Sequence, residues 1–153
     1  MIFTISRSYD EITKELGKDS VISLISCNNC VRACGTGGQA KMRELAEKLK
    51  GDSYNVRDGF LLTKACPQPY MGAVRLDRTV DTLVVLACYA GYSNARRRFP
   101  DLKVVQTTED VGLSIPDSDR RTLERAMAFA GHENLLGEQF EMGTGKPLWS
   151  NQE

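Results

Sequence analysis

The sequence has no net charge, no long apolar run and no N-terminal signal peptide. Its 20 basic residues balance its 20 acidic residues, so no charge field favours nucleic acid or an anionic membrane as a partner. No apolar stretch approaches the roughly 20 residues that cross a bilayer. The N-terminus lacks the charged start and apolar core of a secretory signal. We therefore expect a cytoplasmic protein with no membrane span and no nucleic-acid partner.

Histidine is equally scarce. His132 is the one histidine of the chain, and no pair of carboxylates, Ser-His-Asp set or Cys-His set stands out. A conventional cysteine hydrolase is therefore not expected, because its thiol needs a histidine base.

Strand and helix patterns alternate along the chain. Apolar runs predict strands at 20–26, 59–65, 82–87 and 102–106. Amphipathic spacing predicts helices that begin at Ser8, cover 38–50, cover about 92–99 before Pro100, and cover 117–130. This alternation predicts an α/β fold, specifically a Rossmann-like or flavodoxin-like three-layer domain. Its mostly parallel sheet would have about four strands, in the order 2-1-3-4.

The pattern lapses from Gly131 onward. We expect an α/β domain over 1–130 and an irregular C-terminal tail over 131–153. The tail contains apolar residues that a free linker would not need, so we expect it to pack on the domain or on a partner. These residues are Phe140, Met142, Leu148 and Trp149.

Five cysteines carry the chemistry, and three of them lie within eight residues. Cys27, Cys30 and Cys34 form the pattern Cys-x-x-Cys-x-x-x-Cys. In a reducing compartment such thiols are not a disulfide framework. Neighbouring thiolates repel one another without a cation, and a short loop can wrap three sulfurs around one centre. We expect a 4Fe–4S cluster here, with Zn²⁺ at the same thiolates as the alternative.

The remaining cysteines follow predicted strands. Cys66 follows the strand at 59–65 and Cys88 follows the strand at 82–87, as Cys27 follows the first strand. In the expected order these three carboxyl ends lie side by side, where parallel sheets form sites. A four-iron cluster needs four cysteines. Cys66 is the predicted fourth ligand, and Cys88 is either an alternative ligand or a neighbour that tunes the centre.

Glycines and one arginine complete the predicted site. Gly35, Gly37 and Gly38 precede the helix at 38–50, which is also how a phosphate-binding turn is built. The pattern is not G-x-G-x-x-G, so we favour close approach of backbone amides to the cluster sulfurs. Arg32 either stabilises the negative charge of the cluster or is a solvated loop residue.

Four segments carry a family likeness. They are Cys-Asn-Asn-Cys-Val-Arg-Ala-Cys-Gly-Thr-Gly-Gly at 27–38, Lys-Ala-Cys at 64–66, Val-Leu-Ala-Cys-Tyr-Ala-Gly at 85–91 and Phe-Pro-Asp-Leu-Lys-Val-Val-Gln-Thr-Thr at 99–108. Together they resemble the small MetV-type subunit of methylenetetrahydrofolate reductase, a family also described as the methylenetetrahydrofolate reductase C-terminal domain. The likeness covers roughly residues 5–115 in the same order, and the unit at 27–38 is its most specific part.

The resemblance implies a function. Such subunits carry an iron–sulfur cluster and pair with a flavin-dependent TIM-barrel reductase subunit in the one-carbon chemistry of the Wood–Ljungdahl pathway. They can also relay electrons from heterodisulfide-reductase-like complexes. Carried over by position, the ligands would be Cys27, Cys30, Cys34 and Cys66. Longer members have a second cysteine-rich half, but no cysteine follows Cys88 here. The resemblance therefore implies a shortened, non-catalytic subunit with one centre.

Two other functions are compatible with the cysteines. The centre could be structural zinc in an assembly subunit of the same reductase. Alternatively, Cys27 and Cys30 could act as a thiol–disulfide oxidoreductase, since Cys-x-x-Cys lies between a strand and a helix. Cys34 in the same loop argues against this third function.

Overall fold

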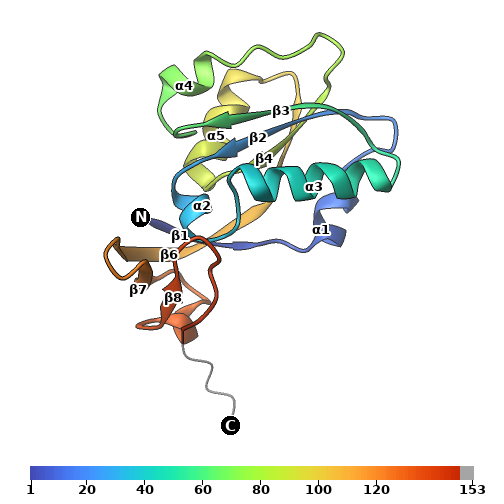
Figure 1. Cartoon of the computed structure of the whole chain (residues 1–153). Helices are drawn as coiled ribbons and strands as arrows, with labels where there is room; N and C mark the ends of the chain where they lie inside the picture. The colour runs from blue at the N-terminus through green and yellow to red at the C-terminus, as the bar shows by residue number, and fades with distance from the viewer. Residues whose placement is uncertain (149–153) are drawn as a thin grey trace.

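The computed structural model describes residues 1–148, which form two four-stranded sheets with helices around one of them (Figure 1). Trp149, predicted to help pack the tail, lies outside the described residues. Within that described part, no helix has both the length and the apolar character needed to cross a membrane.

The first sheet is parallel. Its strands run in the order β3-β2-β4-β5, with bounds β2 Val21–Cys27, β3 Asn55–Leu62, β4 Thr82–Leu86 and β5 Lys103–Gln106. The predicted α/β class and strand order are confirmed. Every residue of β4 is buried, as its continuous apolar sequence predicts. Strand β3 is an edge strand with alternating exposure, and it ends at Leu62. Cys66 therefore lies in the following loop and not at the strand end that we predicted.

Helices pack on both faces of the parallel sheet. On one face lie α1, Tyr9–Lys14, and α3, Gln39–Gly51; on the other lie α4, Gln68–Gly72, and α5, Tyr89–Arg98. The Ser8 hydroxyl accepts a hydrogen bond from the Glu11 amide at 3.2 Å, which is the predicted cap of α1. A single turn, α2, covers Cys30–Ala33.

The second sheet is antiparallel, and the sequence analysis did not predict it. Its order is β1-β6-β7-β8, with bounds β1 Ile2–Ser6, β6 Thr108–Asp117, β7 Thr122–Ala128 and β8 Gln139–Glu141. The predicted helix at 117–130 is wrong. Leu123, Ala126, Met127 and Ala130 fit a helical stripe, but Leu123 and Arg125 are buried while Met127 is more than half exposed. Burial at every second residue is the period of a strand, and pairing with β6 stabilises it.

The segment after Gly131 is not irregular throughout. It contains a short 3-10 helix, η1 Glu133–Leu135, and strand β8. The buried Phe140 ring lies 4.8 Å from the Phe3 ring. Further on, the Gly143 amide donates to the Ala33 carbonyl at 2.7 Å. The chain therefore returns from β8 to the cysteine loop.

Candidate metal centre

The cysteine loop is held between the two sheets. Strand β2 ends at Cys27, and the Asn28 amide donates to the Leu62 carbonyl of β3 at 2.8 Å. The chain then forms α2, which begins at Cys30 and is followed by Cys34. Since α2 contacts both β1 and β2, the loop joins the parallel sheet to the antiparallel one.

Helix α5 positions the other two cysteines. Cys88 is the residue that precedes its first turn. One turn further, the buried side-chain amide of Asn94 donates to the carbonyls of Ala65 at 2.9 Å and Cys66 at 3.3 Å. The loop that carries Cys66 is therefore fixed by the same helix that begins at Cys88, and both lie at the carboxyl edge of the parallel sheet.

The five thiols differ in exposure, and none is in a disulfide. Cys27, Cys34 and Cys88 are buried, Cys30 is half-buried and Cys66 is exposed. Burial raises the pKa of each of the three buried thiols, and the negative charge of Cys30 raises each of them further. Backbone amides of Ala65 and Asn29 at the Cys27 sulfur oppose that rise. Cys30 begins α2 and lies between Cys27 and Cys34 in the loop.

The donor chemistry fits a thiophilic metal. Within residues 1–148, no group of three or more His, Cys, Asp or Glu side chains is close enough together to hold a metal ion as it stands. The cysteines nevertheless come from three segments that meet at one edge of a sheet, and soft thiolates select iron–sulfur clusters or zinc. A bound metal deprotonates its thiol ligands outright, which would overcome the raised pKa values. Binding would require the sulfurs to move closer together than they lie here.

Cys34 faces the second sheet. It packs in an apolar cluster with Phe3 of β1, Val111 of β6 and Leu123 of β7, and its thiol donates to the Ile2 carbonyl at 3.6 Å. The same cluster borders the buried Arg125 of β7, whose guanidinium lies 4.6 Å above the Phe3 ring. Sequence reasoning missed β1 and Arg125, because the buried alternate position along 122–126 is an arginine and the residues show no apolar alternation.

The three predicted glycines lie where other parts of the chain pack closely against the loop backbone. A Cβ on Gly35 would lie 2.3 Å from the Thr144 carbonyl oxygen, and one on Gly37 would lie 2.3 Å from Val31. Their amides donate to the Arg32 and Val31 carbonyls, and the Gly38 amide donates to the Ser26 hydroxyl at 2.8 Å. The amides that we expected to reach cluster sulfurs are therefore engaged within the protein.

Arg32 is exposed on α2. It borders a hollow of about 520 Å³ at the start of α3, with Asn28, Gly38 and Leu61 among its other lining residues. Its guanidinium is thus on the solvent side of the loop, as expected for the solvated alternative. The buried cation of this region is Arg125.

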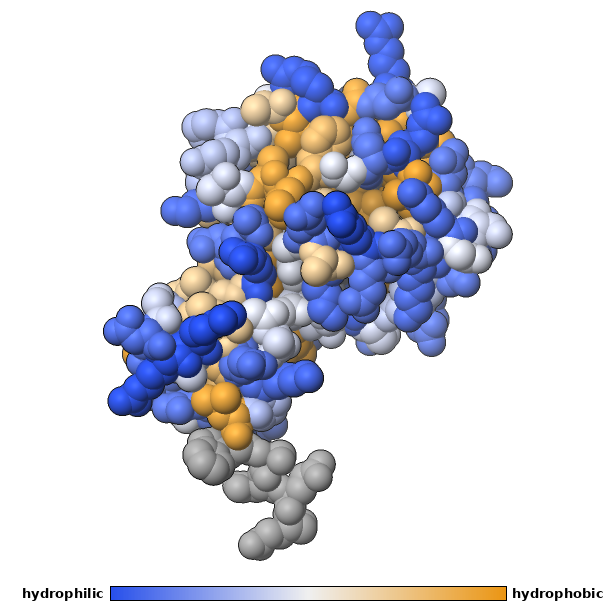
Figure 2. Space-filling view, viewed as in Figure 1, coloured by the Kyte–Doolittle hydropathy of each residue, from blue (hydrophilic) through white to orange (hydrophobic). Residues whose placement is uncertain are grey.

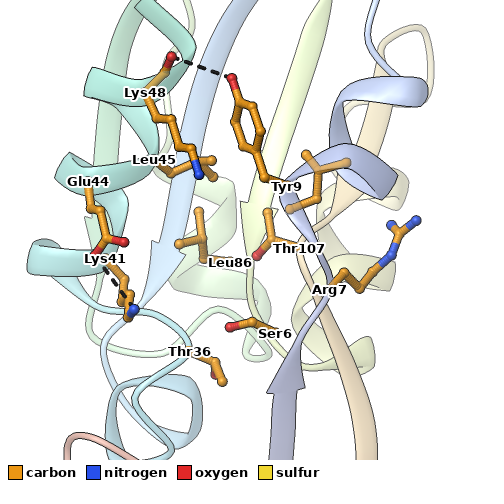
Figure 3. Close-up of a pocket in the computed structure, with 11 residues that line it drawn as sticks. Ser6, Arg7, Tyr9, Thr36, Lys41, Glu44, Leu45, Lys48, Leu86 and Thr107 are labelled. Carbon is orange, nitrogen blue, oxygen red and sulfur yellow. Dashed lines mark hydrogen bonds and ion pairs between the residues drawn. The ribbon is translucent and has the colours of Figure 1, made fainter. Parts of the chain in front are cut away.

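A separate cavity of about 160 Å³ lies between α1 and α3 (Figure 3). Lys41 pairs with Glu44 at 3.6 Å and Arg7 pairs with Glu15 at 2.7 Å, while the Lys48 ammonium lies 4.4 Å from the Tyr9 ring centroid. None of the five cysteines lines this cavity, so it is separate from the candidate metal centre.

The rim around the cysteines has exposed apolar side chains. Leu61 near the end of β3 is 39% exposed, Tyr70 of α4 is 43% exposed, and Tyr89 beside Cys88 is 58% exposed. In the space-filling view, apolar side chains also show beside the hydrophilic cover of α3, over the parallel-sheet half (Figure 2). Exposed large apolar side chains on the elements that flank the cysteine segments suit a surface that meets another protein.

Asn94→Leu tests how firmly the Cys66 loop is held. Leucine keeps the volume but leaves the Ala65 and Cys66 carbonyls without their donor. We expect the free energy of unfolding to fall by about 2 kcal/mol, measured by urea denaturation of the metal-free protein. The neighbouring Ser93→Ala is the control and should change it by less than about 0.5 kcal/mol. Equal effects of the two variants would show that Asn94 does not hold the loop.

No protein-family model matches the chain, and no curated protein or solved structure matches it either. The family likeness of the cysteine segments therefore stays a prediction from the sequence.

Proposed function

We propose that this chain is an accessory, cytoplasmic electron-transfer subunit of a methylenetetrahydrofolate reductase and carries one 4Fe–4S cluster. The observation that supports the proposal is that Cys27, Cys66 and Cys88, from three segments, lie at the carboxyl edge of one parallel sheet, with Cys30 and Cys34 in the loop after Cys27. The parallel half would serve as a Rossmann-like support. The cluster would supply one-electron transfer, and the chain itself would do no chemistry on the folate.

We assign the ligands to Cys27, Cys30, Cys34 and Cys66. Cys34 is favoured over Cys88 by its surroundings. The negative charge of Asp110 raises the pKa of Cys88, whereas Cys34 packs in the same cluster as Phe3, over which the Arg125 guanidinium lies. A thiolate is stabilised by a nearby cation and destabilised by a nearby acid, so Cys88 is better suited to a neighbouring role at the start of α5.

The apolar rim supports docking to a partner. A flavin-dependent TIM-barrel subunit is the partner that the sequence resemblance implies, and a heterodisulfide-reductase-like complex is the second. Cys66, Tyr70 of α4 and Tyr89 of α5 are all exposed. A partner that covers this rim would bring its flavin toward the cluster edge.

The thiol–disulfide function is less well supported. A dithiol enzyme needs an accessible thiol with a lowered pKa, whereas Cys27 is buried and its pKa is raised by burial.

Anaerobic purification with metal and sulfide analysis tests the proposal. We expect about four iron and about four labile sulfide per chain, and rapid re-oxidation of the reduced protein by the flavoprotein partner. One zinc without labile sulfide would instead favour the assembly subunit. A protein that holds neither metal after anaerobic reconstitution would exclude both.

A further inference from the structure

Arg125 is a buried cation without a full set of partners. Its side chain is 0% exposed, and one Nη donates to the Val111 carbonyl at 3.0 Å. Within residues 1–148, its Nε and other Nη have no hydrogen-bond partner. Burial lowers the pKa of Arg125, but a guanidinium remains protonated in proteins. A buried charge of this kind is costly unless an opposite charge lies nearby.

The strand holds this cation rigidly. The Arg125 amide donates to the Glu138 carbonyl at 3.0 Å, and its carbonyl accepts from the Gly137 amide at 2.9 Å. Its guanidinium stacks over Phe3. Both the backbone and the side chain are therefore fixed, and the positive charge has a defined place beside β1.

The cysteine loop lies against the same part of β1. Cys34 and Phe3 belong to one apolar cluster, and the Cys34 thiol donates to the carbonyl of the preceding Ile2. Phe3 is the side chain that both groups share, because the Arg125 guanidinium lies 4.6 Å from its ring centroid and Cys34 packs in the same cluster. The nearby Glu138 is exposed to solvent, so the cysteine loop is the interior segment that lies beside this cation.

We propose that Arg125 is the counter-charge of the metal centre, a positioning residue that offsets the negative charge of its thiolates from within the second sheet. This inference rests on the proposed function. Uptake of one electron at the centre adds one negative charge, which a fixed nearby cation stabilises. Arg125 should therefore raise the reduction potential and slow the loss of metal. It would also explain why the chain builds a second sheet beside the cysteine loop.

Potentiometric titration of the anaerobically prepared protein tests this. Arg125→Met removes the charge and keeps an extended apolar side chain, and it should lower the equilibrium constant for reduction about tenfold, which is about 59 mV for one electron. Arg125→Lys keeps the charge and should stay within about twofold of the unmodified protein. Arg120→Met is the control, because that arginine is on the same hairpin and its side chain is 81% exposed; it should change nothing.

The rate of iron loss to a chelator gives a second measurement. Arg125→Met should lose iron about tenfold faster, and Arg125→Lys should restore the slow rate. If Arg125→Met does not fold, Arg125→Lys decides the question, because lysine keeps the positive charge but loses the guanidinium geometry. A reduction potential and a rate of iron loss that match the unmodified protein support a charge role. A change in the reduction potential as large as that expected for Arg125→Met overturns it. Suppose that the unmodified protein contains iron and sulfide but all variants have the same reduction potential. That result would overturn this inference and leave the proposed function intact. If the unmodified protein contains no iron and no sulfide, the proposed function itself is overturned.

Discussion

Cys30→Ala is expected to abolish the metal centre. Cys30 is the middle thiol of the Cys-x-x-Cys-x-x-x-Cys loop and begins α2, so its removal takes away a proposed ligand that no neighbouring loop residue can supply. Iron should fall from about four to below about one per chain after anaerobic reconstitution. The measurement is iron and sulfide content together with the visible absorption of the cluster.

Cys88→Ala is the matched control for that prediction. It also removes one buried thiol at the same edge of the sheet, but Cys88 is assigned a neighbouring role, so this variant should keep most of its iron. Loss of the cluster from Cys88→Ala, with retention in Cys34→Ala, would exchange the roles of these two cysteines. Retention in Cys30→Ala would contradict the whole assignment.

Gly35→Ala is expected to give the largest loss of stability among single methyl additions in the loop. Gly35 has a φ of +71°, and its Cβ would lie 2.3 Å from the Thr144 carbonyl oxygen. The backbone strain and the clash together should lower the free energy of unfolding by about 3 kcal/mol. Urea denaturation of the metal-free protein measures this without any contribution from the centre.

Gly131→Ala separates the clash from the strain. Gly131 also has a positive φ, +88°, but nothing lies within 4 Å of its Cβ position. We expect a loss of about 1 kcal/mol there. If the two variants lose the same amount, the contact between 143–146 and the Cys34–Gly35 turn is not tight in solution.

The parts of the fold that were predictable have strong local patterns. Strand β4 is apolar throughout, and α3 has a regular amphipathic stripe, so both match their predictions closely. The strand order followed from the alternation of strands and helices. The edge strand β3 was misplaced because its exposed positions break the apolar run on which the prediction relied.

The second sheet could not be predicted from local patterns. Strand β1 pairs with β6, which is about a hundred residues later, and no short window contains that information. In β7 an arginine occupies a core position, so the apolar residues of this segment do not alternate as they would in a typical strand. Their spacing fits only a helix. The strands that lead to Cys27 and Cys88 are neighbours in the sheet, as predicted, but the buried Arg125 escaped detection for the same reason.

The pairing of β1 with β6 has a consequence for biosynthesis. The Met1 amine donates to the Ser114 carbonyl across 113 positions, so the first strand emerges from the ribosome long before its partner does. All strands of the parallel sheet precede β6 in the chain, and they can pair first. The cysteine loop would then stand open on one side until the late hairpin arrives. We expect the proposed centre to take up its metal most easily during this interval.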